Sequence, residues 1–342
     1  MPVWLDSQFM ETHNATSALI DRFNRRVDYL RVSVTDRCDM RCSYCIPKHF
    51  TGYEDPADWL TFDELTQVIR VFSSLGVRRV RLTGGEPLLR RNLPDLVGRI
   101  AALPGIADVS LSTNGTRLDR HAAALAKAGL KRVNISLDSL DQGCIEKITG
   151  RDALDNVLHG IKAAEMAGLS PIKINMVILA GVNEHEINRM VEFALNGGYI
   201  LRLIELMPMS DTARSLEGLD LSASVRKRLV SRYDLVPSAS ELGGGPAVYW
   251  ETRDGSGTVG FISPMSQHFC ATCNRVRLTV EGTLLLCLGQ EHCLELRPLL
   301  RAGISDVELA VQIREAIDRK PERHEFVETP EKLVRVMSRT GG

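Results

Sequence analysis

Segments with the character of β-strands and α-helices alternate between residues 28 and 209, at intervals of roughly 25 to 35 residues. This alternation is typical of repeated βα units around a parallel sheet. Because about eight such units close a barrel, six predict an α/β fold with an incomplete (β/α)6 TIM-like barrel. The six strand segments are rich in β-branched and apolar residues and comprise residues 29–36, 78–84, 107–114, 132–139, 172–179 and 199–207.

Helix signals separate these strands. Thr61 followed by Glu64 predicts a capping box, in which each residue satisfies a free backbone donor at the start of a helix. Gly76 predicts the end of that helix, because glycine readily adopts the left-handed conformation found after helices. These signals support helical crossovers between the strands.

The pattern changes after Met209. A polar stretch, a glycine run at 243–245 and a hairpin turning at Glu281-Gly282 follow. The chain then continues with an amphipathic helix at 306–320 and a polar end that carries no packing signal. We therefore expect an unassigned N-terminal extension at 1–20, a partial barrel at 21–209 and a smaller C-terminal α+β domain at 210–342.

The charge is nearly balanced, with 42 basic and 43 acidic residues in 342. No overall field draws such a chain toward nucleic acid or an anionic membrane. The first 23 residues lack the basic start and apolar core of a signal peptide, and no stretch reaches the roughly 20 apolar residues of a spanning helix. We expect a cytoplasmic protein with no nucleic-acid or membrane partner, in which clustered cysteines indicate metal binding or catalysis.

Cys38, Cys42 and Cys45 form a C-x3-C-x2-C motif directly after the first strand. A structural zinc site usually takes four ligands, so a Cys3His knuckle completed by His49 is one interpretation. A [4Fe-4S] cluster held by three cysteines would instead leave one iron open for a ligand. The position at a strand end favours the second interpretation, because the carboxyl ends of barrel strands gather function on one rim.

The other strand ends carry motifs too. Gly84-Gly85-Glu86-Pro87 follows the second strand, where glycines permit close backbone approach and the carboxylate can accept from an ammonium. "STNG" at 112–115 follows the third strand. Ser136 to Asp138 and Met207 lie at the ends of the fourth and sixth strands. We expect these residues to share one rim of the barrel.

A second triplet, Cys270, Cys273 and Cys287, spans the predicted hairpin. A zinc site completed by Cys293 or His292 is the simpler interpretation of this spacing alone. Arg275 and Arg277 stand two residues apart on a strand, so their side chains share a face beside Cys273. Arginine binds phosphate through paired hydrogen bonds, and these two could form a polyanion site with further barrel cations, namely Arg31, Arg81 and Lys173.

The first cysteine motif with Tyr44 and the Gly84–Pro87 segment resembles the radical S-adenosylmethionine superfamily. Both triplets, the strand-end motifs and the terminal glycines together resemble the GTP 3',8-cyclase (molybdenum cofactor biosynthesis protein A) family, from Asp21 to Gly342. The resemblance implies two [4Fe-4S] clusters and S-adenosyl-L-methionine as cofactors. It also implies conversion of GTP to (8S)-3',8-cyclo-7,8-dihydroguanosine 5'-triphosphate, the first step of molybdenum cofactor biosynthesis.

The same resemblance assigns site residues position by position. The cluster ligands would be Cys38, Cys42, Cys45, Cys270, Cys273 and Cys287. The S-adenosylmethionine site would comprise Tyr44, Gly84, Gly85, Glu86, Pro87, Ser136 and Met207. The GTP site would comprise Arg31, Arg81, Ser112, Lys173, Arg275, Val276 and Arg277. The catalytic tail would be Gly341 and Gly342.

The family further implies an external one-electron donor, a cyclic pyranopterin monophosphate synthase that receives the product, and a homodimer. Two alternatives stay open: a radical enzyme that modifies a peptide with an auxiliary cluster, and a metal-binding scaffold without activity. Cys144 and Cys293 match no ligand position, and Cys144 is most simply a buried small hydrophobe.

Overall fold

The computed structural model of the protein describes residues 18–47, 49–209, 221–240, 242–326 and 337–340. Six neighbouring strands pair in parallel at its centre. They are β1 (Tyr29–Ser33), β2 (Arg79–Thr83), β3 (Asp108–Thr113), β4 (Arg132–Ser136), β5 (Ile172–Val177) and β6 (Ile200–Ile204). Each lies within the segment expected from the sequence, so the partial barrel is confirmed.

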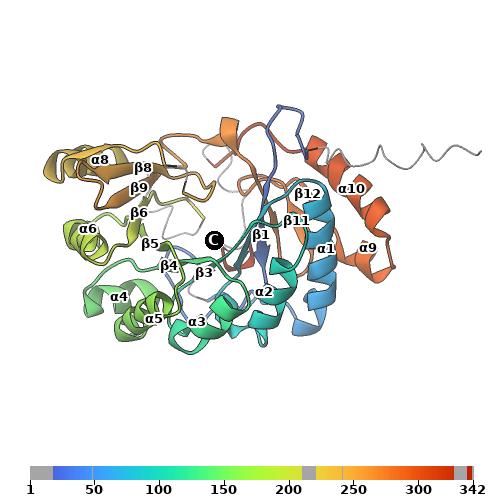
Figure 1. Cartoon of the computed structure of the whole chain (residues 1–342), viewed down its shortest axis with the longest axis horizontal. Helices are drawn as coiled ribbons and strands as arrows, with labels where there is room; N and C mark the ends of the chain where they lie inside the picture. Colours follow the sequence, from blue (N-terminus) through green and yellow to red (C-terminus); the bar gives the residue numbers. More distant parts are fainter. Residues whose placement is uncertain (1–17, 48, 210–220, 241, 327–336, 341–342) are drawn as a thin grey trace, which may run out of the picture.

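Strands from the C-terminal part of the chain extend this sheet at both edges. β10 (Arg275–Leu278) pairs in parallel with β1, and β11 (Thr283–Leu285) and β12 (Cys293–Glu295) follow in antiparallel order. On the other side β9 (Thr258–Ile262) pairs in parallel with β6, followed by antiparallel β8 (Val248–Thr252) and β7 (Leu235–Pro237). The described strands thus form one open 12-stranded sheet in the order β12-β11-β10-β1-β2-β3-β4-β5-β6-β9-β8-β7 (Figure 1).

The C-terminal part therefore continues the barrel sheet, with no separate sheet among the described strands. The domain boundary near residue 210 stays a prediction. The hairpin at Glu281-Gly282 is confirmed, since β10 and β11 pair across it and Gly282 has a φ of 95°.

Six helices lie along the outer face of the sheet (Figure 1). They are α1 (Phe62–Ser74), α2 (Leu93–Ala101), α3 (Leu118–Lys127), α4 (Gln142–Thr149), α5 (Leu154–Met166) and α6 (Ile187–Asn196). The capping box of α1 is confirmed, because Glu64 N donates to Thr61 Oγ1 (3.2 Å) and Thr61 N donates to Glu64 Oε2 (2.7 Å). Gly76, with φ 92°, follows the end of this helix as expected.

Later in the chain lie α8 (Leu221–Arg232), α9 (Arg297–Arg301), α10 (Asp306–Asp318) and α11 (Met337–Thr340). The amphipathic helix predicted at 306–320 is confirmed as α10, which is tied to α1 by a salt bridge from Arg70 Nε to Asp306 Oδ2 (2.8 Å). The expectation of a polar end without packing is wrong for residues 337–340. Ser338 and Thr340 are only 1% and 3% exposed.

Side chains along the strands alternate between the apolar core beneath the helices and a polar face on the other side of the sheet. Leu30, Val80, Leu111, Val133 and Ile174 are fully buried and face the helices. Side chains one position away face the opposite side, because strand residues point alternately to the two faces. The pairing register places three arginines in a row there, since Arg31 lies opposite both Arg81 and Arg277.

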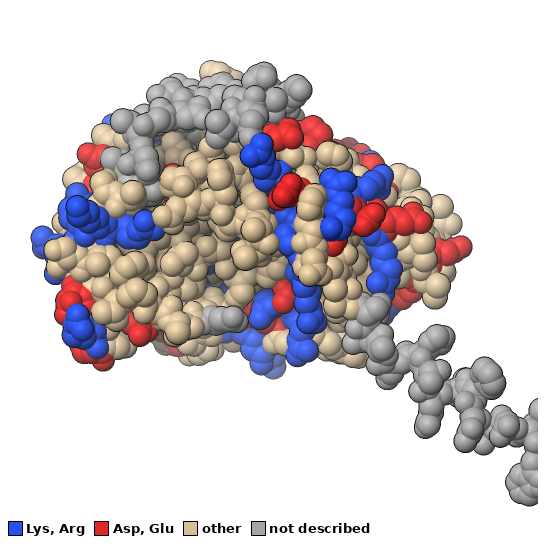
Figure 2. Space-filling view, turned by 90° about the horizontal axis from the view of Figure 1, so that it is seen from above, with Lys and Arg blue, Asp and Glu red and all other residues tan. Residues whose placement is uncertain are grey.

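The outer surface carries both charges. Lys and Arg side chains lie among Asp and Glu side chains over the face seen in Figure 2. Within the part of the chain that the structure describes, no helix has the length and apolar character needed to cross a membrane.

Candidate active site

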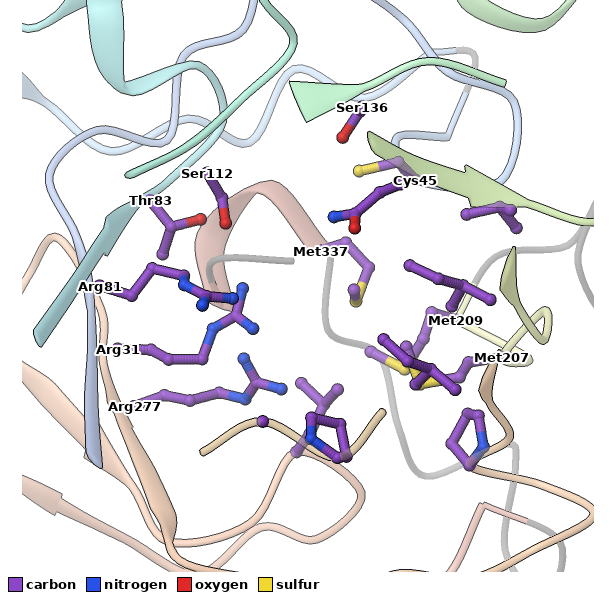
Figure 3. A pocket seen from close by; sticks show the side chains of 18 of the residues that line it. Arg31, Cys45, Arg81, Thr83, Ser112, Ser136, Met207, Met209, Arg277 and Met337 are labelled. Carbon is purple, nitrogen blue, oxygen red and sulfur yellow. The ribbon is translucent and has the colours of Figure 1, made fainter. Parts of the chain in front are cut away.

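A cavity of about 330 Å³ lies on the polar side of the sheet and brings most of the expected site residues together. All six expected cluster cysteines line it. So do Arg31, Arg81, Ser112, Arg275, Val276, Arg277, Tyr44, Gly84, Gly85, Ser136 and Met207. Three arginines point into the cavity from one side in Figure 3, while Cys45, Ser136 and Met207 lie around its other sides.

Three expected residues lie outside this lining, and two others fall outside the described residues. Glu86, Pro87 and Lys173 do not line the cavity. Gly341 and Gly342 belong to the part of the chain that is not described. The cavity therefore shows which of these residues lie together, while their roles stay predictions.

The first cysteine triplet sits in the loop after β1. Arg41 N and Ser43 N donate to the carbonyls of Thr149 and Ile148 (2.8 and 2.9 Å), which holds this loop against the end of α4. Burial raises the pKa of Cys38 and Cys45 to about 12. Thiols in such surroundings become thiolates when a metal cation compensates their charge.

His49 is exposed and does not line the cavity, whereas all three cysteines do. Among the described residues, no three His, Cys, Asp or Glu side chains are placed to hold a single metal ion. A [4Fe-4S] cluster does not need that placement, because each cysteine binds a different iron. The donor set fits such a cluster with one iron open.

Gly84 and Gly85 let the end of β2 approach the cysteine loop. Gly85 N donates to Thr35 O (2.8 Å), and Glu86 N donates to Arg37 O (2.7 Å). A Cβ at Gly84 would lie 2.2 Å from Thr35 O, and one at Gly85 would lie 2.2 Å from Arg37 O. A residue with a side chain at either position would therefore clash with the backbone of the loop that carries the first cysteine triplet.

Replacing Gly85 with Ala should displace this loop, since the new methyl would overlap backbone atoms of Arg37. We expect a loss of about 1–3 kcal/mol in unfolding free energy, as for other overpacked sites, and reduced iron at the first cluster. Iron analysis and denaturant unfolding measure these effects. The control is Gly98→Ala, whose methyl would meet its nearest atom at 3.9 Å, and equal losses in both variants would contradict the prediction.

Glu86 braces the strand ends. It is fully buried, and its carboxylate accepts from Leu88 N (3.0 Å), Thr113 Oγ1 (2.7 Å) and Asn114 N (2.7 Å). Burial raises the pKa of Glu86 to about 7. These contacts link the Gly84–Pro87 segment to the turn after β3, so the carboxylate is already engaged by protein donors.

Asp138 was expected at a strand end but was given no role in the site, and it lines the cavity. Its carboxylate accepts from Tyr44 Oη (2.8 Å) and Val177 N (2.8 Å), and burial raises its pKa to about 6. Tyr44 is thereby fixed between the cysteine loop and the ends of β4 and β5. The sequence signal was the position of Asp138 just after the fourth strand.

The arginine row is the most strongly cationic part of the cavity. Burial, together with the neighbouring Arg277 and Arg81, lowers the pKa of Arg31 well below its usual value. Burial and the neighbouring Arg275 lower the pKa of Arg277 to about 10. Buried like charges disfavour one another, so an anion that joins them would be strongly stabilised.

Arg202 is a further cation that sequence reasoning missed. It lines the cavity from β6, and it donates to Asn175 Oδ1 and Asn134 Oδ1, both at 2.8 Å. Burial lowers its pKa to about 10, with Arg81 adding to the effect. The period-two alternation of β6 places it on the same face as the arginine row.

Lys173 is 1% exposed, and its ammonium donates to Leu242 O (2.5 Å) and Tyr249 Oη (3.2 Å). Burial and the positive charges of Arg202 and Arg132 lower its pKa to about 6. Its partners lie in and beside the segment that carries the glycine run at 243–245. The structure therefore places Lys173 next to, rather than on, the cavity lining.

The second triplet combines two parts of the C-terminal chain. Cys270 begins a 3-10 turn (Cys270–Thr272), Cys273 follows it, and Cys287 comes after β11. Although burial raises it, the pKa of Cys273 is lowered to about 7 by the positive charges of Lys320 and Arg275. This environment favours a thiolate ligand, and the triplet also fits a [4Fe-4S] cluster with an open iron.

The alternative zinc ligands do not join this group. Cys293 is exposed, and neither it nor His292 lines the cavity. Cys144 is buried at 9% exposure, and its Sγ contacts Val182 O at 3.6 Å, which confirms the packing role expected for it.

Comparison with known proteins gives consistent results over the whole chain. The radical SAM superfamily profile matches residues 32–194, and the Molybdenum Cofactor Synthesis C profile matches residues 199–326. The GTP 3',8-cyclase of Pseudomonas putida (strain W619) is 48% identical over 330 residues, covering 95% of this chain and 98% of the relative. The GTP 3',8-cyclase of Hydrogenovibrio crunogenus is 45% identical over 317 residues, covering 91% and 95%.

Among solved structures, Streptococcus suis SuiB bound to S-adenosylmethionine has a TM-score of 0.56. It is 16% identical, and the match covers 88% of this chain and 71% of that one. This likeness concerns the fold. The extent and identity of the sequence matches show that the chain belongs to the GTP 3',8-cyclase family of the radical SAM superfamily.

Proposed function

We propose that the chain is a radical SAM lyase that converts GTP to (8S)-3',8-cyclo-7,8-dihydroguanosine 5'-triphosphate, the first step of molybdenum cofactor (molybdopterin) biosynthesis. One observation carries this proposal beyond family membership. Two cysteine triplets face a single cavity, and a row of arginines lines the same cavity. A cofactor at one triplet and a polyanionic nucleotide at the other would meet there.

Cys38, Cys42 and Cys45 would hold a [4Fe-4S] cluster whose open iron would bind S-adenosylmethionine. When bound, this pair and one electron yield methionine and the 5'-deoxyadenosyl radical. Tyr44, Gly84, Gly85, Ser136 and Met207 surround the cofactor, since all five line the cavity. Glu86 and Pro87 support this site without lining the cavity. The Glu86 carboxylate joins their segment to the turn after β3 by accepting hydrogen bonds from it.

Cys270, Cys273 and Cys287 would hold a second [4Fe-4S] cluster, whose open iron would supply a binding site for the guanine base. Arg31, Arg81 and Arg277 bind the triphosphate, with Ser112, Arg275 and the backbone at Val276 beside them. Lys173 lies beside this site, where its ammonium donates to Leu242 O and Tyr249 Oη, and we assign it to GTP binding with the arginines. Residues on this side of the cavity would thus hold the nucleotide, while the residues around the first triplet would hold the cofactor that supplies the radical.

The electron count defines what else the reaction needs. Loss of hydrogen from C3' and attack on C8 form the new bond and leave one unpaired electron on the base. One further electron and one proton complete the 7,8-dihydro ring. An external one-electron donor therefore serves the protein twice per turnover, and a cyclic pyranopterin monophosphate synthase receives the product. We place the enzyme in the cytoplasm, as a homodimer.

The test is assay of the anaerobically reconstituted, reduced protein with S-adenosylmethionine and GTP. We expect 5'-deoxyadenosine and the cyclised triphosphate in equal amounts. Iron content alone would not separate this function from peptide modification, whereas GTP binding does. Cofactor cleavage without any cyclised nucleotide would refute the proposed substrate.

Replacing both Arg275 and Arg277 with Ala should weaken GTP binding. A charge-assisted contact contributes about 1.5–3 kcal/mol, so each lost contact should weaken binding roughly tenfold to hundredfold. Calorimetry with GTP on cluster-loaded protein measures the change. The matched control removes two exposed charges, in Arg120→Ala with Arg319→Ala. Unchanged affinity in the first variant, with both clusters present, would contradict the role of this pair.

A further inference from the structure

Lys320 is a buried cation beside the second cysteine triplet that the proposed reaction does not use. It is 1% exposed and follows the end of α10, where its backbone N–H donates to Ile317 O (2.9 Å). Its ammonium lies 3.5 Å from Cys273 Sγ and donates to Leu286 O at 2.7 Å. The ammonium therefore contacts Cys273 itself and the residue immediately before Cys287.

A buried ammonium is costly unless an opposite charge compensates it. The Leu286 carbonyl is neutral and satisfies one of three N–H donors. The Cys273 sulfur, 3.5 Å away, can carry a full negative charge once it is a cluster ligand, and Lys320 also acts electrostatically on the Cys287 thiol. The sulfur is thus the natural counter-charge for Lys320.

Arg25 fixes the segment that carries Lys320. Its guanidinium donates to Pro321 O (2.6 Å) and Glu322 O (2.7 Å), the two residues after Lys320, and to Cys270 O (2.9 Å). Asp21 Oδ2 in turn accepts from Arg25 Nε at 2.6 Å. One buried ion pair thereby ties the Lys320 segment to the loop of the second triplet.

We infer that Lys320 is a positioning residue for the second cluster: its ammonium donates to the Cys273 sulfur and raises the reduction potential of that cluster. A hydrogen bond to a ligand sulfur and a nearby positive charge both stabilise the more negative, reduced state. The positive charges of Arg275 and Arg25 also act on the Cys273 thiol, so Lys320 is one of three cations that stabilise its thiolate. The inference rests on the proposed second cluster.

The experiment is a redox titration of the full-length chain, followed by electron paramagnetic resonance. Cys38, Cys42 and Cys45 are first replaced with Ala, so that only the second cluster contributes. In this background Lys320→Met should lower the midpoint potential. We expect at least a roughly tenfold smaller ratio of reduced to oxidised cluster at a fixed potential, which corresponds to about 59 mV for one electron. Arg319→Met removes an exposed cation one residue away and should leave the midpoint unchanged.

Lys320→Gln keeps a hydrogen-bond donor without the charge and should give a smaller shift in the same direction. It also keeps the test decisive if the Met variant loses its cluster. Unchanged midpoints in the loaded Lys320 variants, or an equal shift in Arg319→Met, would overturn the inference. Absence of about four irons from the background chain with Lys320 intact would instead refute the second cluster itself.

Discussion

Replacing Cys42 with Ala is expected to abolish formation of 5'-deoxyadenosine from S-adenosylmethionine. Cys42 is the middle ligand of the first triplet, and its loop is held against α4 by backbone hydrogen bonds on either side of it. Without this thiolate the [4Fe-4S] cluster lacks one of its three protein ligands, and among the described residues no cysteine outside the two triplets lines the cavity to replace it. We expect cleavage to fall by at least about a thousandfold, or some 4 kcal/mol in barrier height.

The second triplet should respond differently. Cys273→Ala removes a ligand on the substrate side, so cyclised product should disappear while some reductive cleavage of S-adenosylmethionine continues. Cys144→Ala is the matched control, because Cys144 is buried and lies off the cavity. Quantifying 5'-deoxyadenosine and cyclised triphosphate in all three variants separates the two roles. Reductive cleavage by Cys42→Ala at the normal rate would refute the first assignment.

Local patterns carried enough information to predict the barrel. Its strands alternate between buried apolar residues such as Val80 and Leu82 and polar residues such as Arg81, which the register then aligns with Arg31. The capping box at Thr61 depends on residues three positions apart, so it too could be predicted from the sequence. The same alternation predicts that Arg275 and Arg277 share a face, as they do at the cavity.

Long-range pairing could not be read from such patterns. β9 and β10 join opposite edges of the barrel sheet, and nothing in their own residues specifies those neighbours. The surroundings of Lys173 and Glu86 depend on segments remote in the chain, the loop at Leu242 and the turn at Asn114. A charge pattern cannot tell whether such a group faces a ligand or a protein partner.

Lys320 illustrates the same limit. In the sequence it is one cation at the end of an amphipathic helix, where positive charge is common. Only the packing of α10 against α1 and the contacts of Arg25 bring it to Cys273. Cysteine spacing predicted the ligands of the second triplet, but not the charges that surround them.

Deleting Gly341 and Gly342 should reduce cyclised product steeply while leaving the fold and both clusters intact. The two glycines lie outside the described residues, but the residues before them approach the site. Met337 lines the cavity, and a backbone hydrogen bond from Ser338 reaches Cys45. Arg339 donates to Gly52 O at 2.7 Å and pairs with Glu54, which anchors α11 beside the first cysteine loop.

Because glycine has no Cβ, we expect the two residues after this anchor to tolerate close packing that a larger residue would not. Their loss should lower cyclised product roughly tenfold to hundredfold, or about 1.4–2.7 kcal/mol in the barrier of a step after S-adenosylmethionine cleavage. Replacing both glycines with Ala is the matched variant, since it keeps the length of the chain and adds two methyl groups. It should impair product formation as well, with GTP affinity and 5'-deoxyadenosine formation retained in both variants. Full product yield from the truncated chain would show that α11 ends the functional part of the protein.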